Sequence, residues 1–246
     1  MTEEKQTPTW KLAKVAAENE DVTSVFIEAP RDARGKMLER RPGQFATIRV
    51  KTGDAWSAPH PFTISCDPDQ DQVQFTIKKA GRFTSGLRDL KPGAEIMCQG
   101  PFGVFCKDID TRENIVMIAG GVGITPFLSV LRFFRKNKTH NRVLLFWSNK
   151  TVADAFARDE LREMTRELDL TVVHVISREE PPTDSGGERI FFEKGRFDRN
   201  MLERHGAAPS ASFYLCGPPA MQDAVLETLN SCGIDAGNVQ REAFKF

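Results

Sequence analysis

A glycine-rich run in the second half of the chain has the composition of a phosphate-binding loop. It reads Gly120-Gly121-Val122-Gly123-Ile124-Thr125-Pro126. Glycine lets the backbone turn tightly and approach a ligand without a Cβ in the way, and the free amides at a helix start attract anions. The hydroxyl of Thr125 adds a donor. Because a tight strand-to-helix turn needs glycine for its own geometry, the run by itself leaves both a structural and a phosphate-binding turn open.

A second run could act beside a bound nucleotide. It reads Tyr214-Leu215-Cys216-Gly217-Pro218-Pro219-Ala220-Met221. It again places a turn between an apolar stretch and a helix, with the Cys216 thiol facing a crevice. Most free cysteines are small buried hydrophobes, and the spacing leaves both interpretations of Cys216 open.

Alternating strands and helices must position these two turns. Apolar runs typical of buried parallel strands are Ile115–Ala119, Val143–Trp147, Thr171–Ile176 and Phe213–Cys216. Helices are expected from Pro126, over Ala157–Leu168, and from Pro218 to near Gly233, whereas a long loop is expected over Arg178–Arg196. The pattern predicts a parallel sheet covered by helices, with both turns at the carboxyl ends of strands, where such sheets bind ligands.

The first half of the chain has short β-rich runs separated by turn residues. The expected strands are Val22–Ala29, Gln44–Val50, Val73–Lys79 and Glu95–Gln99, and a short helix is expected over Ser85–Leu90 after a Thr84 cap. This spacing predicts a small antiparallel barrel or sandwich. We therefore predict two domains, residues 1–108 and 109–246.

Composition restricts the function classes. Lys+Arg and Asp+Glu both total 34, so no overall field favours nucleic acid or anionic lipid. No apolar stretch approaches the length of a membrane span and no signal peptide is visible, so we expect a cytoplasmic protein without membrane insertion. The five cysteines and four histidines show neither disulfide nor metal-ligand spacing. No metal is expected, and a redox centre would have to be an organic cofactor.

At these motifs the chain resembles the ferredoxin-NADP reductase superfamily, over about Trp10 to Phe246. The resemblance implies an antiparallel β-barrel flavin domain followed by an α/β parallel-sheet nucleotide-binding domain. The family's flavin motif corresponds to His60-Pro61-Phe62-Thr63-Ile64-Ser65, a variant similar to that of the ferric reductase and NADPH oxidase branch. It implies that Phe62 stacks on the isoalloxazine, that Thr63 bonds near N5, and that His60 replaces the usual pyrophosphate arginine. Without the family, the tract is typical of an edge strand that starts at a proline.

The resemblance also assigns the other cofactor contacts. Ile77 and Lys78 would border the flavin and its ribityl chain, and Gly81, Phe83 and Thr84 would form the pyrophosphate segment. Nicotinamide nucleotide would lie on the glycine run at Gly120, Gly121, Gly123, Ile124, Thr125 and Pro126, and beside Cys216, Gly217 and Pro218. Glu242-Ala243-Phe244 matches the family's acidic-x-aromatic terminus, in which the aromatic covers the flavin. Lys245 and Phe246 follow, so either Phe244 or Phe246 could be that aromatic, and the alignment favours Phe244.

The implied activity is hydride transfer from NADH or NADPH to a bound flavin, FAD rather than FMN, and then electron transfer to a separate acceptor. Thr63, Cys216, Glu242 and Phe244 are the expected catalytic residues. Ser148-Asn149-Lys150-Thr151 contains neither an acidic residue nor an arginine cluster. It resembles the corresponding stretch of NADH-using cytochrome b5 reductases, which favours NADH, whereas Lys150 leaves a phosphate contact open. The basic residues that could dock an acidic ferredoxin or flavodoxin are Lys78, Lys79, Arg82, Arg88 and Lys91. A flavin-binding subunit of a larger redox complex and a dehydrogenase without flavin are the alternatives.

Overall fold

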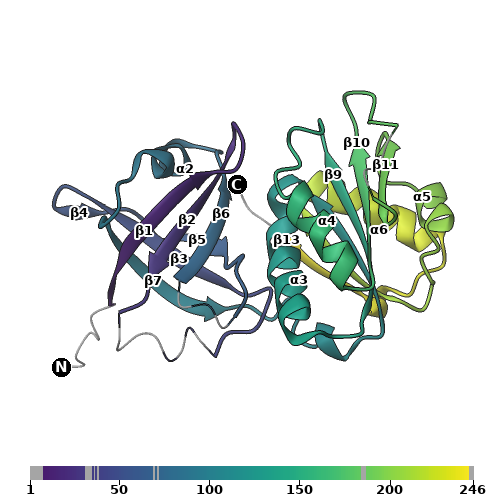
Figure 1. The fold of residues 1–246 in the computed structure, drawn as a ribbon, viewed down its shortest axis with the longest axis horizontal. Helices are drawn as coiled ribbons and strands as arrows, with labels where there is room; N and C mark the ends of the chain where they lie inside the picture. The colour runs from purple at the N-terminus through teal and green to yellow at the C-terminus, as the bar shows by residue number, and fades with distance from the viewer. Residues whose placement is uncertain are drawn as a thin grey trace. The chain divides into compact units, whose positions relative to one another are not determined.

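The computed structural model describes residues 8–30, 35, 37, 39–68, 70, 72–183 and 187–243. The chain forms two compact units, Met1–Val104 and Phe105–Phe246, each with its own hydrophobic core (Figure 1). The two units are described separately below.

The first unit is an antiparallel sheet that closes on itself. Its strands are β1 (Thr9–Ala17), β2 (Val22–Glu28), β3 (Phe45–Thr52), β4 (Ala55–Trp56), β5 (His60–Thr63), β6 (Gln72–Lys78) and β7 (Glu95–Phe102). Their order is β4-β3-β7-β1-β2-β6, and β5 pairs with β3. Directly after β5, Ile64 bridges to Phe75 of β6, which joins the two ends of this order. The antiparallel barrel expected from the sequence is confirmed.

Alternation along the strands fills the barrel. Val25 and Ile27 of β2 and Phe75 of β6 point into a core with Trp10 and Ile48. All five side chains are at most 2% exposed. The remaining helical segments of this unit are α2 (Arg82–Gly86) and the 3₁₀ turn η1 (Leu87–Asp89).

Helix α2 begins three residues before the expected start. The Thr84 hydroxyl oxygen accepts hydrogen bonds from the amides of Ala80 (2.8 Å) and Gly81 (3.0 Å), and it donates to the Gly81 carbonyl (3.1 Å). Thr84 therefore lies inside the first turn and not at its cap, because its hydroxyl bonds backward along the chain. The helix expected over Ser85–Leu90 was misplaced for this reason.

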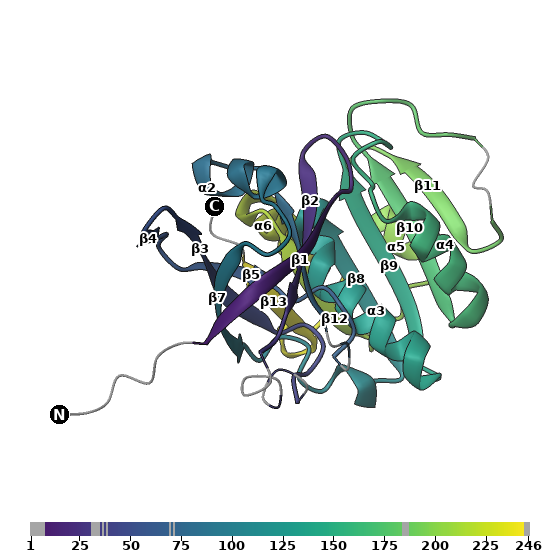
Figure 2. The ribbon, with the colours of Figure 1, turned by 60° about the vertical axis from the view of Figure 1, so that its left-hand side comes forward.

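The second unit is a parallel sheet between two layers of helices (Figure 2). Its strands are β8 (Asn114–Gly120), β9 (Arg142–Asn149), β10 (Leu170–Ile176), β11 (Ile190–Lys194), β12 (Ser212–Gly217) and β13 (Val239–Ala243), in the order β11-β10-β9-β8-β12-β13. Its helices are α3 (Thr125–Asn137), α4 (Arg158–Glu167), α5 (Arg199–Arg204) and α6 (Pro219–Ser231), with 3₁₀ turns η2 (Ile109–Thr111), η3 (Gly121–Ile124) and η4 (Ala236–Asn238). Every pairing in this sheet is parallel, which confirms the expected α/β fold.

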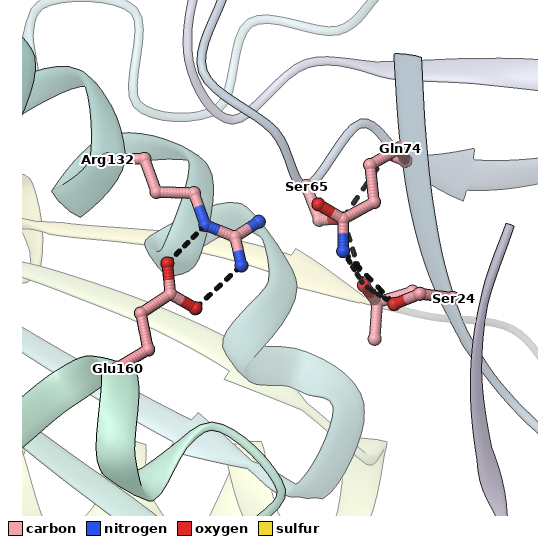
Figure 3. Close-up of polar contacts among 6 residues, drawn as sticks. Ser24, Ser65, Gln74, Arg132 and Glu160 are labelled. Carbon is pink, nitrogen blue, oxygen red and sulfur yellow. Dashed lines mark hydrogen bonds and ion pairs between the residues drawn. The ribbon is translucent and has the colours of Figure 1, made fainter. Parts of the chain in front are cut away.

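Each face of this sheet has its own core. Side chains of α3 and α4 pack with Ile115, Met117 and Trp147, whereas α5 and α6 pack with Val116 and Ile118. A two-point ion pair joins α3 to α4, because Arg132 Nε and Nη2 each lie 2.7 Å from an oxygen of Glu160 (Figure 3). This pair fixes the spacing of the two helices that follow the glycine run and β9.

Candidate functional site

The two turns singled out from the sequence meet where the strand order of the second unit reverses. From β8, the sheet continues through β9, β10 and β11 on one side and through β12 and β13 on the other. The glycine run follows β8, and Gly217-Pro218 follows β12, its neighbour, in which Cys216 pairs with Ala119. Such a reversal is the place where open parallel sheets leave a crevice for ligands.

The glycines of these two turns are in close contact. A Cβ on Gly123 would lie 2.4 Å from the Cys216 carbonyl oxygen, and one on Gly120 would lie 2.3 Å from Met221 Sδ. Gly121 has a left-handed backbone conformation (φ 52°), and a Cβ added to it would have no atom within 4 Å. Gly120 and Gly123 therefore serve the packing of the turns, whereas Gly121 leaves open backbone of the kind a phosphate approaches.

Three side chains brace these turns from behind. The indole Nε1 of Trp147 donates to the Gly121 carbonyl at 2.8 Å. The Thr125 hydroxyl, which is 1% exposed, donates to the Val122 carbonyl at 3.0 Å. Gln222 Nε2 donates to the carbonyls of Gly217 (2.9 Å) and Glu242 (2.8 Å), tying α6 to β12 and β13. Neither Trp147 nor Gln222 was foreseen, because a tryptophan in an apolar strand and a glutamine in a helix carry no local signal of such a role.

Cys216 and Glu242 lie side by side on adjacent strands. Their Cα atoms are partners in the pairing of β12 with β13. Cys216 is fully buried, and that burial together with the nearby Glu242 raises the pKa of its thiol far above the usual range. Partial burial also raises the pKa of the Glu242 carboxyl. The thiol is protonated at neutral pH, so it provides polarity without acting as a thiolate nucleophile.

The first four residues of the tract that the resemblance assigns to the flavin, His60–Thr63, form β5 in the first unit. Thr63 is 7% exposed, and its neighbour Phe62 is half-buried against the barrel core. The His60 ring stacks on Phe83 with centroids 3.8 Å apart and planes at 18°, and Phe62 lies parallel to Phe83 within 9° at 6.1 Å. The fold therefore brings the motif on β5 next to the start of α2, segments that are separate in the sequence.

The start of α2 presents backbone donors. The first bond of the helix runs from Ser85 N to the Gly81 carbonyl at 2.9 Å, so the preceding amides of Phe83 and Thr84 lie ahead of the helical ladder. Lys78 ends β6 and is half-exposed, whereas the side chain of Ile77 packs in the barrel core. Exposed Pro61 lies between His60 and Phe62 on β5.

A buried polar network covers the outer face of the barrel beside Thr63. Ser24 Oγ lies 2.8 Å from Thr76 Oγ1, Ser65 Oγ lies 3.0 Å from the same atom, and Gln74 Nε2 donates to Ser24 at 3.0 Å (Figure 3). Ser65 follows two residues after Thr63, the last residue of β5. Nothing in the sequence indicates that these polar side chains meet, because they come from three separate segments of the chain.

Other expectations have simple outcomes. Phe244, the aromatic expected over the flavin, and its alternative Phe246 lie outside the described residues. Arg88 is engaged within the first unit, because its guanidinium donates to Thr23 Oγ1 (3.0 Å), the Asn19 carbonyl (2.7 Å) and the Val22 carbonyl (3.1 Å).

In the described ranges, no group of three or more His, Cys, Asp or Glu side chains is placed to hold a metal ion. Over the same ranges, no helix has the length and apolarity that a bilayer crossing requires.

Two family models match the chain in the order of its two units. Residues 8–109 match an FAD-binding domain, and residues 117–227 match an oxidoreductase NAD-binding domain. The chain belongs to the ferredoxin-NADP reductase superfamily. The ferredoxin NADP⁺ reductase from Neisseria gonorrhoeae, solved with FAD and NADP, shares the fold with a TM-score of 0.77 at 18% identity, covering 96% of this chain and 98% of that one.

Two curated relatives in the superfamily match nearly the whole chain. The Bacillus subtilis flavohemoprotein is 27% identical over 98% of this chain and 61% of its own length. The reductase component of propane 2-monooxygenase from Rhodococcus jostii is 30% identical over 95% of this chain and 62% of its own length. This chain thus spans about three fifths of each relative. The superfamily and the expected order of an FAD-binding domain followed by an NAD-binding domain are confirmed.

Proposed function

We propose that the chain takes hydride from NAD(P)H onto FAD and passes the electrons to a separate acceptor, such as ferredoxin, flavodoxin or another electron-transfer protein. One observation carries the proposal. The glycine run and the Cys216-Gly217-Pro218 turn, far apart in sequence, meet at the reversal of the strand order, in a chain that also contains an FAD-binding domain.

For the nicotinamide half, the backbone around Gly121 receives the pyrophosphate, and Trp147 holds that backbone in place through its bond to the Gly121 carbonyl. Cys216 and Glu242 then line the position of the reacting ring. Burial raises the pKa of both groups, and the Cys216 thiol stays neutral beside the ring. Phe244 remains the aromatic that we propose as the gate over the flavin.

For the flavin half, Phe62 stacks on the ring system, Thr63 donates or accepts at N5, and the amides of Phe83 and Thr84 bind the pyrophosphate with His60. FAD supplies the hydride-accepting and electron-transferring chemistry, so the protein's task is to bind and orient it. The polar network supports this assignment, because it ties Ser65, two residues after Thr63, to β2 and β6.

The acceptor is proposed from surface charge. Lys78, Lys79, Arg82 and Lys91 form the basic set that would meet an acidic electron-transfer protein, and Arg88 is left out because its guanidinium is engaged. A subunit within a larger redox complex is the second candidate. It is favoured by the names of relatives, among them a monooxygenase reductase component and one subunit of a Na⁺-translocating NADH-quinone reductase.

The test is an anaerobic titration of the FAD-loaded protein with NADH and, separately, NADPH, followed by the visible flavin absorbance. We expect stoichiometric bleaching by one of the two nucleotides. Thr63→Ala should retain FAD but slow its reduction, whereas Thr63→Ser should reduce at close to the parent rate because it keeps the hydroxyl. If neither nucleotide reduces the bound FAD, the proposed oxidoreductase activity is rejected and the role as a subunit of a larger redox complex is favoured.

A further inference from the structure

A single buried glutamine holds the turn after β12. Gln222 is 2% exposed and lies near the start of α6. Its backbone amide donates to the Pro218 carbonyl at 3.1 Å, and its side-chain Nε2 donates to the Gly217 carbonyl at 2.9 Å. A Cβ on Gly217 would lie 3.1 Å from the amide nitrogen of Gly120, so the turn is packed against the glycine run. One residue therefore binds two consecutive carbonyls of the turn that borders this run.

The same side chain also reaches the last strand of the sheet. Gln222 Nε2 donates to the Glu242 carbonyl at 2.8 Å, although the two residues are 20 positions apart. Strand β13 is five residues long, and among the described strands it pairs with β12 alone, because it lies at the edge of the sheet. The ends of such short elements are the first parts of a fold to open. The bond from Gln222 therefore gives the end of β13 that carries Glu242 a second support.

The two side-chain bonds depend on the chemistry of an amide nitrogen. Carbonyl oxygens only accept hydrogen bonds, and the NH₂ group of glutamine has two hydrogens, one for each of the carbonyls of Gly217 and Glu242. An apolar side chain of the same size would leave both carbonyls without this donor, and a carboxylate would repel them. Gln222 thus joins β12 to β13 through a contact that packing alone does not replace.

We propose that Gln222 is a positioning residue for hydride transfer, which holds Glu242 and Cys216 in a fixed arrangement beside the reacting ring. Cys216 directly precedes Gly217, and its Cα is the partner of the Glu242 Cα in the pairing of β12 with β13. Without the amide of Gln222, the end of β13 can shift relative to β12. A displacement of about 1 Å lowers reaction rates by as much as about 100-fold. The inference rests on the proposed function, since it assumes that the nicotinamide reacts beside Cys216 and Glu242.

The experiment compares Gln222→Met with Val225→Ala. Methionine has a similar length to glutamine but no donor. Val225, also in α6 and 2% exposed, packs in the core on the same face of the sheet, so Val225→Ala weakens the packing of α6 without removing a bond to either carbonyl. Gln222→Asn, which keeps the amide but is too short to reach both carbonyls, replaces Gln222→Met if that variant does not fold.

The measurements are made on the FAD-loaded protein. They are the Tm, the affinity for NAD⁺ and for NADP⁺ by titration calorimetry, and the rate of flavin reduction by stopped-flow absorbance. The rate is measured at saturating concentrations of whichever nucleotide, NADH or NADPH, reduces the parent. Comparing the rate at saturation with the affinity separates an effect on the reaction from an effect on binding.

We expect the rate at saturation to fall by about tenfold or more in Gln222→Met. The nucleotide affinity should stay close to that of the parent, because the glycine run keeps its own contacts. Val225→Ala should reduce its flavin at close to the parent rate even where its Tm falls as far. Equal slowing in both variants, an unchanged rate in Gln222→Met, or a loss of affinity alone would overturn the inference and leave the proposed function in place. A parent whose FAD neither nucleotide reduces would reject the proposed function and the inference with it.

Discussion

Replacing Gly123 with alanine should disturb both nucleotide-binding turns at once. The new Cβ would lie 2.4 Å from the Cys216 carbonyl oxygen, 2.7 Å from its carbonyl carbon and 2.9 Å from Gly217 Cα. These are backbone atoms, so no side-chain rotation relieves the contact. Ordinary contact begins near 3.4 Å, so the two turns would have to separate by about 1 Å.

The cost can be estimated from this geometry. Overpacking a well-packed region costs about 1–3 kcal/mol, and an obstacle made of backbone favours the upper end. For a chain of this length, about 3 kcal/mol corresponds to a fall in Tm of about 6–12 °C. A displacement of about 1 Å at a binding site lowers reaction rates by as much as about 100-fold, so flavin reduction should slow strongly even where the fold survives.

The assay is thermal unfolding together with NAD⁺ affinity and the rate of flavin reduction. For thermal unfolding alone, Gly121→Ala is the matched control, because it adds the same methyl group where no protein atom lies within 4 Å. Its left-handed backbone should cost only about 1–2 kcal/mol. A Gly123→Ala protein with the Tm, NAD⁺ affinity and reduction rate of the parent would refute the close contact between the turns. So would greater destabilisation by Gly121→Ala than by Gly123→Ala.

Two further predictions concern single side chains. Burial, and then the charges of Arg158 and Arg162, lower the pKa of His174 to about 4, against about 6.5 in the unfolded chain. The neutral ring thus contributes its full stability above about pH 6.5 and loses up to about 3 kcal/mol as the pH falls toward 4. His174→Phe should flatten this part of the profile of unfolding free energy against pH, measured by denaturant unfolding. The control His140→Gln changes an exposed histidine and should leave the profile as it is. Parallel profiles for His174→Phe and the parent would contradict the lowered pKa of His174. Arg88→Ala should lower the stability of the first unit by about 1–2 kcal/mol, because three hydrogen bonds to the β1–β2 turn are lost. Arg82→Ala, an exposed control, should leave unfolding unchanged but weaken binding of an acidic acceptor, and an equal loss of stability in both variants would be evidence against the structural role of Arg88.

The local patterns of the sequence were sufficient for the fold class and for the positions of the main motifs. Continuous apolar runs marked β8, β9, β10 and β12, because strands buried on both faces tolerate few polar residues. Glycines and Pro126 marked the turn after β8. In the second unit, β11 lay inside an expected loop, and the short α5 and β13, which lack a long periodic pattern, were not expected. In the first unit, β1 and β4 were not expected either. Their stability comes from neighbours in the fold, which local periodicity does not record.

Tertiary structure decided which distant groups meet. Closure of the barrel depends on Ile64 bridging Phe75, and the stack of His60 on Phe83 depends on where α2 begins. No local pattern links Gln222 to Glu242, yet its side chain reaches the carbonyls of both Gly217 and Glu242 because β12 and β13 are paired in register. The sequence by itself determined the chemistry of the cofactor motifs and their order, since each is a contiguous run. Contacts between runs were decided only by strand order and register, because these depend on packing free energy summed over the whole sheet.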